Sequence, residues 1–313
     1  MKINKKIKLL LRSNDLTLWL IYIFKYKCSF RIKYFHELHR IRKHAYKKCD
    51  SVKKLRALKN SRQGKKCVIV GNGPSVRFED LDTLQNNKID CFGSNRIVDI
   101  FDKTSWRPTF LCVQDRSFLT GYSSVMTVEE YQRIIDNENL KVFFNDDILP
   151  FMGKDIKKKR NYYFVGCNSS EIFTTRILPF SEDIPLYISD LGSVTQFCIQ
   201  LACYMGYSVI YLYGIDNSFV KFIDDDGKFK VNKSQKMHME GMKGNIDDAV
   251  TDDIPKSNFA AYKLGGFADL RKNNCGYRAC KKFAASHNVG IYNITRGGAL
   301  ELFQRKDFDE IFN

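Results

Sequence analysis

The stretch CVIVGNGPS, residues 67–75, decides the fold of this chain. Four apolar residues run directly into Gly-Asn-Gly-Pro-Ser, which is typical of a buried parallel strand that ends in a tight turn. Gly71 and Gly73 accept backbone angles that a Cβ would forbid, and they are expected to leave their N–H groups open to a ligand. Pro74 and Ser75 suit the first turn of a following helix, whose positive end favours an anion.

Short apolar runs alternate with helical patterns from this stretch to the end of the chain. Strands are expected at 68–70, 89–92, 109–113, 142–144, 162–165, 209–213 and 290–293, and helices at 78–84, 127–136, 194–205 and 277–287, with helical turns at 299–303 and 307–312. The strands end on small or polar residues, as they do at the ligand-bearing edge of an open α/β sheet. The sequence therefore predicts a Rossmann-like α/β fold: a mostly parallel open sheet with helices on both faces.

A second informative stretch covers residues 192–216. Gly192 and Ser193 precede a helix that is apolar at the i, i+3, i+4, i+7 positions, and the strand VIYLY then delivers Gly214-Ile215-Asp216 to the same sheet edge. Ser193 and Thr195 stand where a helix N-terminus can hold phosphate. The alternative is that Ser193 only caps the helix.

Charge divides the chain into two segments. Residues 1–66 hold 21 Lys and Arg against three Asp and Glu, a net charge of +18, and the remaining 30 against 32 give −2, so the basic character belongs to the N-terminal segment. We expect a basic helical N-terminal segment at 1–64 and a nucleotide-binding catalytic domain at 65–313, in which 217–258 forms a lid or insertion. No run is long enough to span a membrane, but the aromatic and basic residues within 1–48 suit a helix on an anionic membrane surface. The alternative is an amphipathic helix packed on the body. Nucleic acid is not expected as a partner, because no reading module accompanies the charge.

The ten cysteines include no CxxC pair, and most lie in apolar runs. Free thiols in a reducing cytoplasm are therefore expected. The acidic run at 224–226 precedes Gly227 between two phenylalanines, which favours the tip of a hairpin over a metal site. Neither a metal nor another cofactor is expected.

Several motifs, in order, resemble a known family. VIVGNGPS, the asparagine after the second strand (Asn95), LGSVTQFCIQLACYMGYSVIYLYGID, and YNITRGGALELF with KDFDEIF look like the bacterial sugar-transferase-related proteins grouped with the MptE-like 6-hydroxymethylpterin diphosphokinase domain. They are also similar, more distantly, to the bacterial lipooligosaccharide sialyltransferases, which bind a CMP-sugar without metal. The resemblance covers roughly residues 65–312.

The resemblance to the sialyltransferases implies roles for individual residues. It puts Asn72, Gly73 and Asn95 at the donor, Asp115 where that family has an asparagine, and Asp216 at the edge of the site. Their general base is a histidine after the GID turn, for which His238 is the candidate here. The candidate nucleotide-binding residues are Gly71, Asn72, Gly73, Ser75, Asn95, Asp115, Gly192, Ser193, Thr195, Gly214, Asn293 and Thr295, and the candidate catalytic residues are His238 and Asp216.

Three functions stay open on these grounds. The first is a cytoplasmic glycosyltransferase, peripheral on the inner face of the cell membrane, that moves a sugar from a nucleotide donor to a glycan or glycolipid acceptor. The second is a diphosphokinase that moves pyrophosphate from ATP to a pterin alcohol and uses Mg²⁺ on Asp115, Asp216 and Asp146. The third is a non-catalytic scaffold that binds membrane through its basic arm. The sequence does not indicate the acceptor or the oligomeric state.

Overall fold

The computed structural model describes residues 49–114, 128–138, 140–146, 148, 159–168, 180–224, 229–232, 234, 236, 238–242 and 268–312. Asp115 and the proposed membrane segment at 1–48 lie outside these residues, as do residues 225–228 at the hairpin tip and most of the predicted lid.

Eight parallel strands form one open sheet in the order β13-β12-β8-β1-β2-β3-β4-β5. The strands are β1 (Lys66–Val70), β2 (Asp90–Ser94), β3 (Phe110–Val113), β4 (Lys141–Asn145), β5 (Tyr162–Val165), β8 (Val209–Tyr213), β12 (Gly290–Asn293) and β13 (Gln304–Arg305). Two small sheets stand apart, one of β9 (Lys221–Ile223), β10 (Phe229–Val231) and β11 (Ala268–Asp269), the other of β6 (Cys167–Asn168) and β7 (Ile188–Ser189). The predicted Rossmann-like α/β fold is confirmed.

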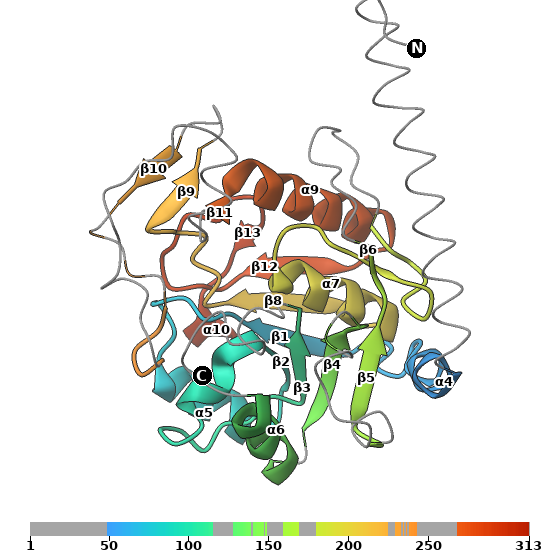
Figure 1. Ribbon diagram of the computed structural model, residues 1–313. Helices are drawn as coiled ribbons and strands as arrows, with labels where there is room; N and C mark the ends of the chain where they lie inside the picture. The colour runs from blue at the N-terminus through green and yellow to red at the C-terminus, as the bar shows by residue number, and fades with distance from the viewer. Residues whose placement is uncertain are drawn as a thin grey trace, which may run out of the picture.

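Helices cover both faces of the sheet (Figure 1). On one face lie α5 (Phe78–Asn86), α6 (Val128–Asn137), α10 (Phe308–Phe312) and a 3₁₀ helix (Asn95–Ile100), and on the other lie α4 (Cys49–Ala57), α7 (Val194–Met205) and α9 (Leu270–Ser286). Successive side chains of β1 point to opposite faces of the sheet. Val68 and Val70 pack on the face covered by α5, α6 and α10, and Cys67 and Ile69 pack on the face covered by α4, α7 and α9. This two-sided burial explains why β1 is apolar at every one of these positions.

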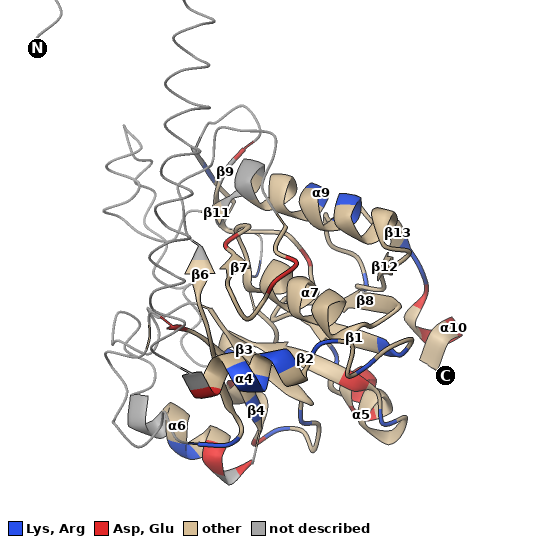
Figure 2. Cartoon of the chain, turned by 90° about the vertical axis from the view of Figure 1, so that its right-hand side faces the viewer, with Lys and Arg blue, Asp and Glu red and all other residues tan. Residues whose placement is uncertain are grey.

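Helix α7 lies between the sheet and α9, so it is buried more completely than the predicted single stripe. Its buried residues include the polar Gln196 and Gln200 as well as the apolar positions. The helix has no charged residue, whereas α4 and α9 carry lysines and arginines (Figure 2). Gly206 ends it at φ +89°, a left-handed conformation that favours glycine.

The strand order reverses direction between β1 and β8. From β1 the chain adds β2, β3, β4 and β5 on one side, and it later adds β8, β12 and β13 on the other. In open parallel sheets, a ligand binds in the crevice outside the carboxyl ends of the two strands at such a switch point. The turns after β1 and β8 are those at 71–73 and 214–216, so the fold brings together the two stretches that the sequence singled out.

Two sequence predictions need correction. Helix α9 begins at Leu270, seven residues before the predicted start, because the polar residues of its first turns do not show a helical stripe. Residues 299–303 form no helical turn, and the chain passes through bends into β13. The backbone groups of β13 find their hydrogen bonds by pairing with β12, and not within a helix. The predicted hairpin is confirmed in its two strands, β9 and β10.

Within the described ranges, no helix is long and apolar enough to cross a membrane. Eight cysteines between Cys67 and Cys280 are free, and six of them are buried. This agrees with the prediction of free thiols in apolar runs. Burial raises the pKa of several of these thiols, among them Cys91 and Cys203 to about 12, so they stay protonated and inert at neutral pH.

Candidate functional site

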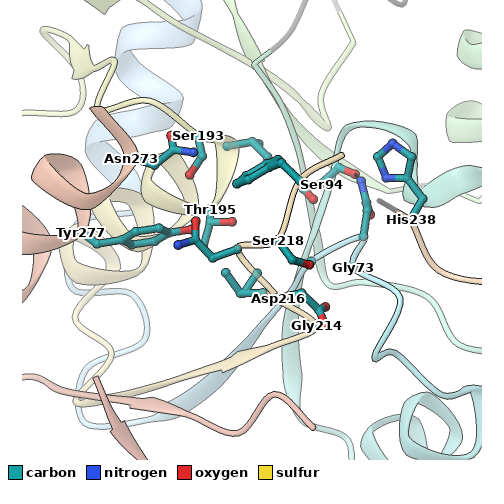
Figure 3. Close-up of a pocket in the computed structure, with 16 residues that line it drawn as sticks. Gly73, Ser94, Ser193, Thr195, Gly214, Asp216, Ser218, His238, Asn273 and Tyr277 are labelled. Atoms are coloured by element: carbon teal, nitrogen blue, oxygen red, sulfur yellow. Dashed lines mark hydrogen bonds between the residues drawn. The ribbon is translucent and has the colours of Figure 1, made fainter. Parts of the chain in front are cut away.

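A cavity of about 160 Å³ opens at the switch point of the sheet (Figure 3). Its wall is made by the turns after β1 and β8, the first turn of α7, the first half of α9, and the segment around residue 238. The lining residues are Gly71, Asn72, Gly73, Ser94, Ser193, Val194, Thr195, Gly214, Ile215, Asp216, Asn217, Ser218, Phe219, His238, Asn273 and Tyr277. Eight of the fourteen candidates named from the sequence therefore meet in one cavity.

The glycines after β1 allow two backbone turns to touch. The N–H of Gly71 donates to the carbonyl oxygen of Tyr213 at 2.8 Å, and the N–H of Gly73 donates to that of Gly214 at 3.1 Å. A Cβ on Gly71 would lie 2.3 Å from the Gly214 oxygen, and one on Gly73 would lie 1.9 Å from Oδ2 of Asp216. The expectation that these N–H groups are open to a ligand is therefore wrong, because both are used to join β1 to β8.

Asp216 is held at this junction by its side chain and its backbone. Its Oδ2 accepts a hydrogen bond from the Ser75 hydroxyl at 2.8 Å, and its carbonyl oxygen accepts one from the N–H of Ala299 at 2.7 Å. The residue is 8% exposed. Burial raises the pKa of Asp216 above its ordinary value, and the bond from Ser75 opposes that shift. A buried carboxylate with a raised pKa in a cavity is a candidate for proton transfer.

Asn293 and Thr295 lie behind the cavity wall. The Thr295 hydroxyl accepts a hydrogen bond from the N–H of Ile215 at 3.1 Å, and the N–H of Thr295 donates to the side chain of Asn293 at 2.9 Å. Arg305 then donates to the carbonyl oxygens of residues 295, 297 and 298. Asn293 and Thr295, which were expected to bind nucleotide, support the turn that carries Asp216 and do not line the cavity.

The first turn of α7 meets α9 at the other end of the cavity. The Gln196 side chain accepts from the N–H of Ser193 at 3.1 Å and donates to the carbonyl oxygen of Asn273 at 2.8 Å. Burial raises the pKa of Tyr277 to about 12, although the hydroxyl groups of Ser193 and Thr195 lower it. The phenol is therefore a neutral hydrogen-bond donor at pH 7.

Asn72 and Asn95 have different surroundings. The side chain of Asn72 donates to the carbonyl oxygen of Ser94 at 3.2 Å, while its own Oδ1 is buried with no hydrogen-bond partner among the described residues. Asn95 adopts φ +46°, accepts from the N–H of Gln114 through its side chain, and accepts from the hydroxyl of Tyr131 at 2.7 Å through its carbonyl oxygen. Asn95 thus joins β2, β3 and α6, and its neighbour Ser94 lines the cavity instead.

His238 lies at the end of the cavity opposite Tyr277 (Figure 3). The N–H of the next residue, Met239, donates to the carbonyl oxygen of Asn72 at 2.8 Å. This bond ties the loop that carries His238 to the turn after β1. The histidine and Asp216 therefore belong to the same cavity, as the sequence predicted, although no described contact joins their side chains.

The sequence did not single out half of the lining residues. Asn273 and Tyr277 are four residues apart on one face of α9, a spacing that could have indicated a shared polar face had the helix been predicted to start at 270. Gly192 stands just before the lining, where its φ of +122° favours glycine, and Ser75 reaches the site through Asp216. Among the described residues, no three His, Cys, Asp or Glu side chains gather as a metal site would require.

A family model described as "6-hydroxymethylpterin diphosphokinase MptE-like" matches residues 42–222, which is more than half of the chain. The chain belongs to the MptE-like family. The curated proteins with which it was compared give no match. This membership associates the MptE-like chain with transferase chemistry.

The match covers the turns after β1 and β8 and the start of α7, and it ends before α9 begins. The α9 residues of this MptE-like protein, Asn273 and Tyr277, therefore complete the cavity from outside the matched region.

Asp216 gives this MptE-like protein a pH-dependent stability that a single substitution tests. Because its pKa is raised in the folded state, the folded protein keeps a proton that the unfolded chain releases, and stability falls as the pH rises through that window. We expect Asp216→Asn to raise the melting temperature at pH 7. The gain should vanish below about pH 4, where the unfolded carboxyl is protonated too.

Thermal unfolding followed between pH 4 and pH 8 measures this effect. The matched control is Asp102→Asn, which changes an exposed carboxylate and should leave the profile unchanged. A gain of the same size at every pH would mean that Asp216 does not titrate as its burial indicates.

Proposed function

We propose that the chain is a glycosyltransferase that takes a sugar from a nucleotide donor, of the CMP-linked type, and transfers it to a hydroxyl group of a glycan or glycolipid. The observation that carries this proposal is that the two ends of the cavity at the switch point carry different chemical groups. One end holds neutral hydrogen-bond donors at the first turn of α7, and the other holds Asp216 and His238. Among the described lining residues, Asp216 is the one carboxylate and none is Lys or Arg.

Such a cavity suits displacement at a sugar carbon. The acceptor oxygen forms a bond to the anomeric carbon while the bond from that carbon to the phosphate oxygen breaks, and the electron pair leaves with the phosphate. The acceptor proton passes to a base, for which His238 and Asp216 are the proposed groups. The positive end of the α7 dipole stabilises the charge that develops on the departing phosphate.

Calorimetric titration of the full chain with CMP, UDP, GDP and ATP tests the proposal. We expect CMP to bind most tightly, since a cavity of about 160 Å³ without a lining cation suits a donor with one phosphate better than one with two or three. If none of the four nucleotides binds, the proposed function fails.

The family match favours a second candidate, a diphosphokinase that transfers pyrophosphate from ATP to a pterin alcohol. That reaction uses Mg²⁺ between carboxylates and phosphates. Asp216 is available in the cavity, Asp146 follows β4 at the same edge of the sheet, and Asp115 lies outside the described residues. Incubation with 6-hydroxymethylpterin, ATP and Mg²⁺ tests it, and failure to form the diphosphate excludes it.

The basic segment at 1–48 is proposed to hold the enzyme on an anionic membrane from the cytoplasmic side. Helix α4, which follows this segment in the chain, packs on the sheet through the buried Leu55. Flotation with vesicles that contain phosphatidylserine, compared with and without residues 1–48, tests this. Equal partition of both chains would remove the anchoring role.

Asn72 is the first residue to change in order to test the cavity. Asn72→Ala removes the bond to the Ser94 carbonyl and the buried acceptor Oδ1, both at the centre of the lining. We expect the affinity for CMP to fall roughly tenfold, as for the loss of one hydrogen bond to a bound ligand. Calorimetry measures the change, with Asn86→Ala, on the exposed end of α5, as the matched control. An unchanged affinity would mean that the turn after β1 does not contact the nucleotide.

A further inference from the structure

At the junction of α7 and α9, several hydrogen-bonding groups have no partner among the described residues. At the start of α7, the N–H groups of Ser193, Gln196 and Phe197 have acceptors. The N–H groups of Val194 and Thr195 have none among the described residues, and both residues line the cavity. A helix of twelve residues therefore presents two N–H groups, unpartnered within the described part of the chain, and its positive dipole end to the cavity.

Asn273 points into the same space from α9 (Figure 3). The residue is only 6% exposed, and its backbone carbonyl oxygen is bonded to Gln196. Its side-chain carboxamide has no hydrogen-bond partner in the described part of the chain. The carboxamide faces the cavity, where a ligand or water is left to satisfy its hydrogen-bonding groups, so its position favours a polar ligand here.

Tyr277, one helical turn further along α9, closes the end of the cavity. It is 2% exposed and lies beside the hydroxyl groups of Ser193 and Thr195. The close approach of the two helices depends on Gly276, since a Cβ there would lie 2.5 Å from Oε1 of Gln196 in α7 and 2.2 Å from the carbonyl oxygen of Leu191. The packing therefore fixes the phenol and the carboxamide relative to the first turn of α7.

We propose that Asn273 and Tyr277 complete a binding site for the phosphate group of the ligand, of which the first turn of α7 forms the other half. The inference rests on the proposed function, because it states which group of the donor binds at which end of the cavity. Two backbone N–H groups, one carboxamide and one phenol are donors that match phosphate oxygens. The sugar and its acceptor then lie toward Asp216 and His238.

Comparison of CMP with cytidine measures what the phosphate contributes to affinity, and Asn273→Asp measures what residue 273 contributes. A carboxylate at 273 would itself accept the free N–H groups of α7 and would repel phosphate. We expect CMP affinity to fall tenfold or more, as for the loss of a hydrogen bond to a charged group, while cytidine affinity stays within about twofold. The melting temperature should stay the same or rise, because the introduced charge lies at the N-terminus of α7.

The matched control is Asn274→Asp, which makes the same charge change one residue along α9, outside the lining. It should leave both affinities unchanged. Tyr277→Phe is the second variant, which keeps the shape of the ring and removes its hydroxyl, and it should weaken CMP roughly three- to tenfold and leave cytidine unchanged.

The outcomes separate this inference from the proposed function. If wild-type protein binds CMP and cytidine equally, or if Asn273→Asp weakens both equally, phosphate does not bind at this junction and the inference is overturned. If no nucleotide binds, the proposed function fails, and titration with inorganic phosphate and pyrophosphate decides the inference alone. It then stands only if wild-type protein binds one of them and Asn273→Asp does not.

Discussion

Gly73→Ala is expected to lower the free energy of unfolding by about 2–4 kcal/mol and to abolish nucleotide binding. The added Cβ would lie 1.9 Å from Oδ2 of Asp216 and 2.7 Å from the carbonyl oxygen of Gly214. The carboxylate can move only by breaking its bond with Ser75, and the Gly214 oxygen belongs to the turn that follows a central strand. Both the fold and the cavity therefore depend on the missing side chain.

Urea denaturation measures the stability loss as a lower midpoint concentration of urea with an unchanged m value, the slope of the unfolding free energy against urea. Calorimetry with CMP measures binding. Gly297→Ala is the control, because φ there is +89° and no atom of the described residues lies within 4 Å of the added Cβ. It should cost only about 1–2 kcal/mol for the left-handed conformation and leave binding intact. If Gly73→Ala matched wild-type protein in both measurements, the contact between the two turns would have no energetic importance.

The elements that form the cavity could largely be predicted from the sequence, and the reason is local. Strands β1 and β8 are short, apolar runs that end on glycine, and α7 has an extended N-cap at Ser193 and a glycine after its last turn. Such signals depend on neighbours within a few residues. Their meeting at one sheet edge then follows from parallel strand order.

The roles of individual residues could not be predicted in the same way. Gly71 and Gly73 have the composition of a ligand-binding loop, yet their N–H groups bond to the turn after β8, about 140 residues away in the chain. Asn95 likewise follows a strand, as a donor-site residue would, but its bonds go to Gln114 and Tyr131. Composition does not distinguish a glycine that admits a ligand from one that admits another turn of the chain.

Helix α9 shows the same limit for a whole element. Its first turns contain Arg, Lys and Asn, which hide the helical period, and the helix is stabilised there by contacts with α7 that no local pattern encodes. The cavity residues Asn273 and Tyr277 were missed for this reason.

Gln200→Leu is expected to cost about 3 kcal/mol or more of unfolding free energy, although it replaces a polar side chain by an apolar one of similar size. Gln200 is fully buried in α7. Its Oε1 accepts from the N–H groups of Ser181 and Ser189 at 3.1 and 3.0 Å, and its Nε2 donates to the Ser189 carbonyl oxygen at 2.9 Å. Leucine would leave three buried backbone groups without these bonds, at about 1–3 kcal/mol each.

The loss of stability in Gln200→Leu should also be local, because the Gln200 side chain holds β7 against α7. Hydrogen exchange at the amides of Ser181 and Ser189 should accelerate more than exchange in β1, whereas Gln63→Leu, an exposed site, should change stability by no more than about 0.5 kcal/mol. Since β7 leads directly into residues 190–192 before Ser193, a loosened β7 should weaken CMP binding at the start of α7. Normal exchange at both serines in Gln200→Leu would show that these amides find other acceptors. The buried glutamine would then have no part in placing the helix at the cavity.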